Sequence, residues 1–253
     1  MAEGDTILRA ARRLERALAG ERVRVRAPNP RGRAAGVERL DGLMVGEVRA
    51  LGKNLVVDFG ELALHSHLGM NGSWHVYAPG ERWRKPARSA WVAMATGDGV
   101  EAVQFGGPTL RVLRTRALRR DPMLSRIGPD LLAPGFEAAD TIRLLRAAPE
   151  RELGEALLDQ GKVAGIGNIF KSEACFGART DPWRRIGELE DDELEHVLRA
   201  ARELMLAAAE TGRHPHNVYR RANWPCLRCG TPIRSRGQGD DNRTTYWCPS
   251  CQA

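Results

Sequence analysis

Residues 157–173 read LLDQGKVAGIGNIFKSE and carry glycines at positions 161, 165 and 167, just before a predicted helix that begins near Asn168. Glycine lets the backbone approach a ligand closely, and the free N–H groups at the start of a helix attract anions. A predicted helix rather than a strand precedes the glycines, which argues against a dinucleotide-binding turn. A tight turn between two helices is the plainer interpretation. In a basic chain, the stretch favours a variant of the helix–turn–helix motif that contacts a DNA backbone.

Helical patterns surround this stretch. Apolar residues at helical spacing predict helices over 136–148, 152–159, 169–176 and 189–211, and the last of these has the clearest apolar stripe. The strand patterns stop at Pro122. We therefore expect a helical domain over residues 123–215.

The N-terminal part shows two periodicities. Residues 7–18 place apolar side chains at helical spacing, and we expect this helix to begin at Asp5 or Thr6 and to end at Gly20. Period-two alternation then predicts eight short strands separated by turn residues. These strands lie at 22–27, 43–51, 54–59, 61–68, 72–78, 90–96, 100–105 and 109–115. The pattern predicts an antiparallel β-sandwich or barrel within residues 1–122.

The tail, residues 216–253, contains two Cys-x-x-Cys pairs separated by eighteen residues. This spacing predicts one structural Zn²⁺, because four thiolates close the metal's tetrahedral shell and leave no open position for catalysis. The ligands are Cys226, Cys229, Cys248 and Cys251. The residues between the pairs predict two strands joined by a Gly/Asp turn, and their arginines suit contact with phosphate. Free or disulfide-bonded cysteines are the alternative. Cys175, on a predicted helix, is expected in the core.

Composition narrows the class of protein. The 253 residues are 42% hydrophobic and 28% charged, which excludes a disordered or fibrous chain. Lys and Arg number 39 against 32 Asp and Glu, and the net charge of +7 favours a polyanionic partner. The sequence has no apolar run long enough for a transmembrane helix, and its start lacks the apolar core of a signal peptide. We therefore expect a cytoplasmic protein with no membrane contact.

Four separated segments resemble one family in the same order. They are MAEGDT at 1–6, HSHLGMNGSW at 65–74, the 157–173 stretch and NRTTYWCPSCQ at 242–252. The family is the formamidopyrimidine-DNA glycosylase/endonuclease VIII family, and the actinobacterial endonuclease VIII branch is the most similar. The resemblance runs over essentially the whole chain. It implies a multidomain α+β fold with a β-sandwich (1–122), a helix–two-turn–helix domain (123–215) and a β-hairpin zinc finger (216–253).

The resemblance also implies a reaction and its partners. The implied activity is that of a bifunctional DNA glycosylase and abasic-site lyase of base excision repair, acting on oxidised pyrimidines by similarity to its branch. The damaged base is extruded, an amine attacks C1′ to form a Schiff base, and β- and δ-elimination then break the strand. Damaged DNA is the implied partner of a monomer that needs one structural zinc and no small-molecule cofactor.

Individual residues match family positions. Glu3 matches the acid/base carboxylate, and Lys53 in LGKNLVV matches a lysine that contacts the phosphate next to the lesion. Asn168 matches an asparagine that grips phosphate, and Arg243 matches the zinc-finger arginine on the same backbone. Met70 matches a residue inserted into the base stack, although its residue type alone favours a core position.

The chain departs from the family at its start. Family members usually carry proline after the initiator methionine, and its amine is the nucleophile, whereas this sequence has Ala2. If Met1 is removed, Ala2 presents a primary amine whose ordinary pKa is about 7.7–8.0 and which forms Schiff bases. If Met1 remains, the amine is displaced by roughly 3.5 Å of chain and the protein binds DNA but reacts slowly or not at all. A proline replaced by alanine to trap a DNA complex would have the same sequence.

Other functions fit parts of the pattern. A glycosylase for bulky alkyl adducts, crosslinks or single-stranded DNA would share all of these motifs. A non-catalytic protein that holds damaged DNA would lack the reactive amine. A zinc-finger transcription regulator fits the basic tail, but it leaves Glu3 and Lys53 unexplained.

Overall fold

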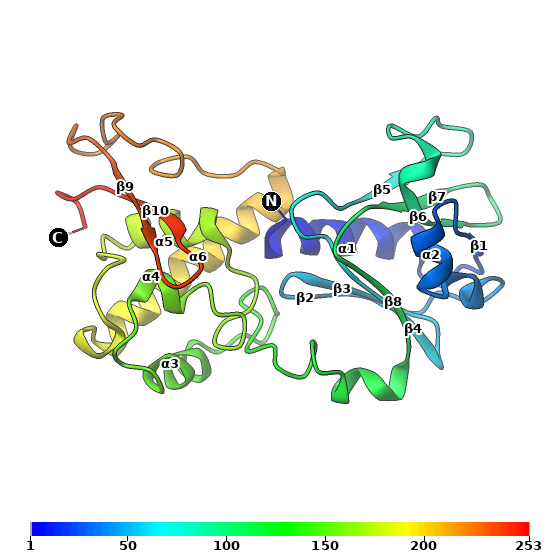
Figure 1. Cartoon of the computed structure of the whole chain (residues 1–253), viewed down its shortest axis with the longest axis horizontal. Helices are drawn as coiled ribbons and strands as arrows, with labels where there is room; N and C mark the ends of the chain where they lie inside the picture. The colour runs from blue at the N-terminus through cyan, green and yellow to red at the C-terminus, as the bar shows by residue number, and fades with distance from the viewer. Residues whose placement is uncertain (1, 253) are drawn as a thin grey trace. The chain divides into compact units, whose positions relative to one another are not determined.

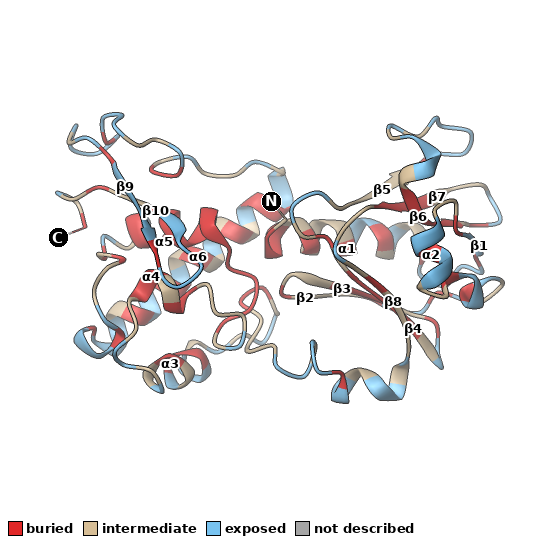
Figure 2. Cartoon of the chain, in the orientation of Figure 1, coloured by how far each residue is buried: buried red, intermediate tan, exposed pale blue. Residues whose placement is uncertain are grey.

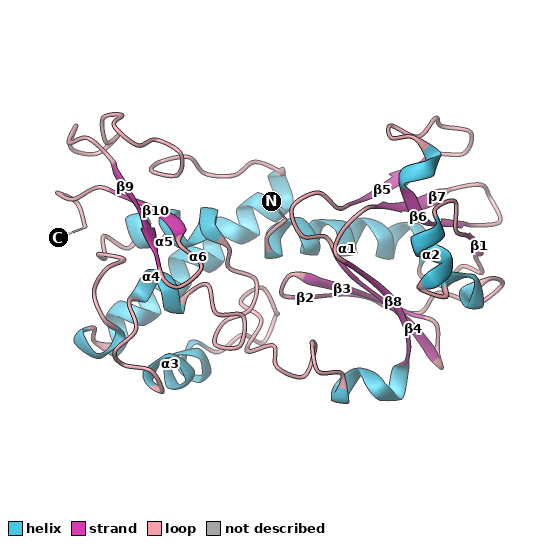
Figure 3. Ribbon diagram, in the orientation of Figure 1, coloured by secondary structure: helices cyan, strands magenta, loops and turns pink. Residues whose placement is uncertain are grey.

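The computed structural model describes residues 2–252. Contacts group residues 1–125 and residues 126–253 into two compact units, which are described separately. Strands dominate the first unit, and the second combines helices with a hairpin (Figure 3). None of the described helices is long and apolar enough to span a bilayer. The boundaries at residues 122 and 215 stay predictions.

Two four-stranded antiparallel sheets form the first unit (Figure 1). Their strand orders are β1-β6-β7-β5 and β2-β3-β4-β8. Each predicted strand is present, which confirms the sandwich. The bounds are Arg24–Arg26 (β1), Val48–Leu51 (β2), Asn54–Asp58 (β3), Leu62–His67 (β4), Ser73–Tyr77 (β5), Ala90–Ala95 (β6), Glu101–Phe105 (β7) and Thr109–Arg114 (β8).

Helix α1 (Gly4–Leu18) contacts both sheets and buries one apolar face between them (Figures 1 and 2). Its N-cap is Glu3, so the prediction of a start at Asp5 or Thr6 was wrong. Asp5 is 1% exposed and lies inside the first turn instead of capping it. Because Glu3 is the N-cap, the start of the chain is fixed directly against the fold.

Short helices that the sequence patterns did not predict connect the strands. Helix α2 (Pro30–Ala34) begins with a proline at its first position, and the Asn29 side chain accepts a hydrogen bond from the Arg31 N–H at 2.9 Å. The 3₁₀ segments are Val37–Leu40 (η1), Ala87–Ser89 (η2) and Thr115–Arg120 (η3) in the first unit and Ile186–Glu188 (η4) in the second.

The second unit contains the four predicted helices. They are Ala138–Arg146 (α3), Leu153–Ala156 (α4), Asn168–Gly177 (α5) and Asp191–Thr211 (α6). Helix α4 is shorter than the predicted 152–159. The Asp159 carboxylate accepts a hydrogen bond from the Gly161 N–H at 2.9 Å, which turns the chain away from the helix. Helix α5 is buried along nearly its whole length, and Cys175 is fully buried there as predicted.

A buried carboxylate fastens the segment that follows α6. Glu173 of α5 is 1% exposed. It accepts hydrogen bonds from the backbone N–H groups of Asn217, Val218 and Tyr219 at 2.8–3.0 Å and from the Asn217 amide at 2.8 Å. Hydrogen bonds to a charged acceptor are the stronger kind, so this segment is held firmly on α5.

Strands β9 (Arg234–Gln238) and β10 (Arg243–Trp247) form the predicted hairpin, with Arg243 opposite Gln238. The buried Gln238 amide donates to the Glu152 carboxylate at 2.9 Å and to the Pro182 carbonyl at 2.8 Å. These two bonds fix the hairpin on the segment around α4.

Candidate functional site

The start of the chain is seated on a turn of the first unit. The backbone N–H of Ala2 donates to the Gly69 carbonyl at 3.2 Å, and Glu3 is fully buried. Gly69 has φ +58, and a Cβ atom there would lie 2.8 Å from Cδ of Pro108. This turn therefore needs glycine, and its carbonyl holds Ala2 and Glu3 at a defined place.

Met70 follows Gly69 on the same turn. Its side chain is 67% exposed, so the interpretation of Met70 as a core residue is wrong. An exposed methionine beside Ala2 has the flexibility and apolar surface to contact a base.

Lys53 lies in the turn between β2 and β3 and is partly buried. Its neighbour Asn54 is paired with His67 across the sheet. Burial, followed by the charge of Lys53, lowers the pKa of His67. The Nδ1 atom of His67 accepts the Gly69 N–H at 3.2 Å. His67 thus connects the strand opposite Asn54 to the turn that holds Ala2.

Sequence reasoning missed three polar residues that hydrogen-bond to one another, two on strands and one after η3. They are His65 of β4, Arg111 of β8 and Asp121, and each is buried or partly buried. Alternation predicted the two strands. It does not give the register that sets His65 directly opposite Arg111, because strand register depends on the whole sheet.

A groove of about 270 Å³ adjoins the turn that holds Ala2. Thr6, Arg9 and Arg13 of α1 line one side, and Ser73–Tyr77 of β5 with Arg84 line the other. None of the described residues that line it is acidic. The groove therefore offers N–H donors and positive charge beside the apolar side chains of Leu68 and Val76.

In the second unit, Asn168 and Arg243 are brought together by α5 and β10. The Asn168 amide donates to the Thr244 carbonyl at 2.7 Å, directly beside Arg243 in the sequence. Behind it, the buried Lys171 ammonium donates to the Thr245 hydroxyl at 2.6 Å, which donates to Gln238 at 2.6 Å. This polar network fixes Asn168 beside the strand of Arg243, although Asn168 itself is buried at 8% exposure.

The arginines of the hairpin differ in their surroundings. Arg243 is 49% exposed and lies 3.9 Å from the Asp241 carboxylate, a loose contact. Arg236, by contrast, lies over the Trp183 ring at 3.8 Å, so its guanidinium is engaged in a cation–π contact. Arg243 is therefore the freer of the two for an external phosphate.

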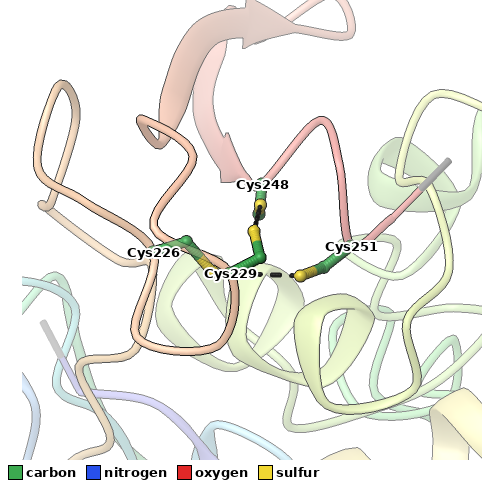
Figure 4. A group of neighbouring side chains, drawn as sticks. All are labelled: Cys226, Cys229, Cys248 and Cys251. Atoms are coloured by element: carbon green, nitrogen blue, oxygen red, sulfur yellow. Dashed lines mark hydrogen bonds between the residues drawn. The ribbon is translucent and has the colours of Figure 1, made fainter.

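The four tail cysteines converge as a metal site would require (Figure 4). Their sulfurs lie within 4.8 Å of one another, with Cys226–Cys251 at 3.9 Å and Cys229–Cys248 at 3.5 Å. Tetrahedral Zn²⁺ with Zn–S bonds of about 2.3 Å sets its sulfurs about 3.8 Å apart. The Arg228 N–H also donates to Sγ of Cys226 at 3.4 Å, which would stabilise a thiolate. The donor set and spacing fit one structural Zn²⁺.

Comparisons with known proteins agree with this geometry. Residues 1–108 match the formamidopyrimidine-DNA glycosylase N-terminal domain, 127–219 match its H2TH domain, and 225–253 match the zinc finger found in FPG and IleRS. A probable endonuclease 8 of Streptomyces coelicolor is 45% identical, over 100% of this chain and 94% of its own. The chain belongs to the formamidopyrimidine-DNA glycosylase/endonuclease VIII family.

Other family members support the assignment. A DNA-(apurinic or apyrimidinic site) lyase of Mycolicibacterium smegmatis is 38% identical over 100% of this chain and 99% of its own. The solved MutM (Fpg) protein of Thermus thermophilus has a TM-score of 0.80 at 29% identity, covering 99% of this chain and 98% of its own. Lactococcus lactis Fpg with abasic-site DNA has a TM-score of 0.83 and covers both chains fully, but at 22% identity it supports the fold alone. The fold, the family and the zinc finger predicted from the sequence are thus confirmed.

Proposed function

We propose that this member of the family excises damaged bases from DNA and cleaves the strand at the resulting abasic site, which the names of relatives as a DNA glycosylase and as a DNA-(apurinic or apyrimidinic site) lyase support. One observation carries the proposal for this chain. The Gly69 carbonyl holds the nitrogen of Ala2, and the next residue is the buried Glu3. A nucleophile and an acid/base group are therefore adjacent at a fixed place.

Removal of Met1 gives Ala2 a free amine. Its lone pair attacks C1′ while the C1′–N bond to the base breaks, and the base leaves with a proton. Glu3 donates a proton to the ring oxygen as the sugar opens, and the nitrogen loses a proton to give the Schiff base. Loss of a C2′ proton then expels the 3′ phosphate, and a second elimination expels the 5′ phosphate. Water finally releases the sugar fragment and restores the amine.

The other predicted residues bind DNA in this proposal. Lys53 contacts the phosphate beside the lesion, and Met70 occupies the space that the extruded nucleotide leaves. Asn168 and Arg243 hold the phosphate backbone from the second unit. Zn²⁺ on the four cysteines keeps the hairpin of Arg243 folded and takes no part in the chemistry.

Borohydride trapping on an abasic-site duplex tests the amine. Borohydride reduces the C=N bond to a stable amine, so an active chain start gives a covalent protein–DNA adduct. Intact mass decides beforehand whether the chain begins at Met1 or Ala2. Protein that begins at Ala2 and gives no adduct would disprove the proposal and leave a damaged-DNA-binding protein.

We further propose that the substrates are oxidised bases, oxidised pyrimidines among them, and not bulky alkyl adducts. The groove beside Ala2 presents arginines and no acid among its lining residues, which suits bases with added oxygen atoms and disfavours alkylated bases that carry positive charge. Its volume of about 270 Å³ is small for a bulky adduct.

Excision rates on matched duplexes check this choice. We expect 5-hydroxyuracil to be excised faster than 7-methylguanine, and Arg13→Gln to reduce the difference. Faster excision of 7-methylguanine by the unaltered protein would overturn the oxidised-base assignment. The proposed lyase activity does not depend on that result.

The remaining assignments concern the setting of the reaction. We propose a monomer that needs no small-molecule cofactor and acts on DNA in the bacterial cytoplasm; the bacterial origin of its relatives supports only the last of these assignments. Light scattering during gel filtration, with and without an abasic duplex, tests the monomer. A dimeric mass in both cases would contradict it.

A further inference from the structure

A chain of hydrogen bonds crosses the outer face of the sheet β2-β3-β4-β8. The Asp121 carboxylate binds the Arg111 guanidinium through two hydrogen bonds of 2.9 and 3.0 Å. Arg111 also contacts Nδ1 of His65 at 2.9 Å. Nε2 of His65 contacts Oδ1 of Asn54 at 2.9 Å. This series of hydrogen bonds thus ends at Asn54, the residue that follows Lys53.

The chemistry of each group fixes the direction of these bonds. Arg111 has only donors, so Nδ1 of His65 must accept. Burial and the neighbouring Arg111 lower the pKa of His65 to about 4, so the ring is neutral at physiological pH. A neutral ring that accepts at Nδ1 carries its proton on Nε2 and donates it to Oδ1 of Asn54. Both ring nitrogens of His65 are engaged by Arg111 and Asn54, so we assign it to holding these neighbours and not to the chemistry.

The series of hydrogen bonds ends at Asn54 on one side and at Asp121 on the other. Asn54 begins β3, and its amide also approaches the Leu51 carbonyl at 3.4 Å, across the turn that carries Lys53. Asp121 accepts the Met123 N–H at 3.1 Å, and the first unit ends only a few residues later at residue 125. The hydrogen bonds therefore join the Lys53 turn to the last residues of the first unit.

Stability alone is a poor explanation for such an arrangement. Buried ion pairs are often no better for stability than apolar residues of similar size, because desolvation offsets the attraction between the charges. An apolar surface would cover this sheet equally well, but it could not hold Oδ1 of Asn54 by a directional hydrogen bond. A directional chain instead defines where Asn54 must lie.

We propose that His65, Arg111 and Asp121 are positioning residues for Lys53, which they hold in place through Asn54. The inference rests on the proposed function in one respect only, the contact between Lys53 and a DNA phosphate. Misplacement of a contacting group by about 1 Å can cost on the order of 100-fold in rate, so a loosened turn should have a measurable effect.

A double-mutant cycle tests the positioning role. His65→Phe removes both bonds of the ring while keeping a buried aromatic side chain, and Lys53→Ala removes the ammonium. On an abasic duplex at subsaturating concentration, we expect His65→Phe to slow cleavage about 10-fold and Lys53→Ala to slow it at least as much. The double variant should match Lys53→Ala alone. Losses that multiply would overturn the positioning role.

Val57→Ala is the matched control, because Val57 lies on the same strand but faces the apolar core. It should lower the melting temperature and leave the cleavage rate of the folded protein unchanged. A loss of rate in this variant equal to that of His65→Phe would indicate general destabilisation and would also overturn the inference.

Amide hydrogen exchange separates this inference from the proposed function. We expect His65→Phe, and not Val57→Ala, to speed exchange at residues 51–54. If Lys53→Ala cleaves normally, the proposed DNA contact of Lys53 is wrong, while faster exchange at 51–54 would still support the positioning of the turn. Unchanged exchange at residues 51–54 in His65→Phe would overturn the positioning role, whether or not Lys53→Ala slows cleavage.

Discussion

In the first unit, a backbone hydrogen bond and the packing of α1 hold the residues proposed to react. In the second unit, a buried polar network and a metal site hold the residues proposed to bind phosphate. Ala2 depends on the Gly69 carbonyl, and Glu3 on the buried start of α1. Asn168 and Arg243 depend on a hairpin whose far end carries the four cysteines.

This difference implies that the functional residues of each unit can be damaged independently of those of the other. Loss of zinc should weaken the DNA contacts of the second unit and spare the reactive end of the chain. Changes at Glu3 should do the reverse. The following predictions examine that division, from the largest expected effect to the smallest.

Replacement of a zinc ligand should have the greatest effect in free energy, because it removes metal binding that folds the segment. Structural zinc in finger peptides binds with about 10–16 kcal/mol of apparent free energy, which becomes folding free energy of the segment. We expect Cys248→Ser to lose the metal, to unfold the hairpin and to bind an abasic duplex at least about 10-fold more weakly. Metal analysis and fluorescence anisotropy measure these changes.

Cys175→Ala is the control for that experiment, since Cys175 is a buried cysteine outside the metal site. It should retain one zinc per chain. Full DNA affinity in metal-free Cys248→Ser would show that the hairpin does not contribute to binding, which contradicts the division between the units.

Glu3→Gln should impair chemistry without impairing binding. Loss of a general acid or base costs about 10²–10⁴-fold in rate. Single-turnover excision should therefore fall by that factor, while anisotropy on an abasic duplex changes little. The exposed Glu21→Gln is the matched control. If Glu3→Gln weakens binding as much as it slows excision, Glu3 is a structural N-cap and not a catalytic group.

The buried His65 makes the first unit sensitive to acid. Its pKa is about 4 when folded and near 6.5 when unfolded, so the unfolded chain binds the extra proton and stability falls as the pH drops from 6.5 towards 4. Between pH 7 and 5 this group alone should remove about 2 kcal/mol from the free energy of unfolding.

Urea unfolding at both pH values measures this loss. His65→Gln should lose less stability over the interval, by about the same 2 kcal/mol. Asp121, whose pKa Arg111 holds below its usual range, titrates below the interval and does not contribute. An equal loss in both proteins would mean that His65 is protonated in the folded state.

Arg243→Gln should have the smallest effect. Removal of one phosphate contact lowers the slope of log K against log salt by about 0.9, with only a modest loss of affinity at low salt. Titrations at several salt concentrations give the slope. Arg228→Gln is the control, because Arg228 stacks on Phe176 at 4.0 Å and donates to the Phe176 carbonyl at 2.6 Å. A slope reduced equally by both variants would contradict the specific role of Arg243.

The parts of this fold that depend on local residue spacing could be predicted from the sequence. Alternation predicted strands such as the one holding Leu55 and Val57, and cysteine spacing predicted the metal site. Contacts between distant residues were not predictable from one sequence. The bond from Ala2 to Gly69 and the chain from Asp121 to Asn54 arise from register and sheet order, which sum many weak interactions over the whole unit. The N-cap at Glu3 was missed because Asp5 is buried by packing, which local cap preferences do not include.

Glu173 should help the metal-free protein to rebind zinc. Its four hydrogen bonds keep residues 217–219 attached to α5 without any help from the metal, and Cys226 follows only seven residues after Tyr219. The first thiol pair thus stays tethered near its destination when the ion leaves. Reloading is then largely an intramolecular closure at high effective concentration, which should make recovery after chelation fast and independent of protein concentration.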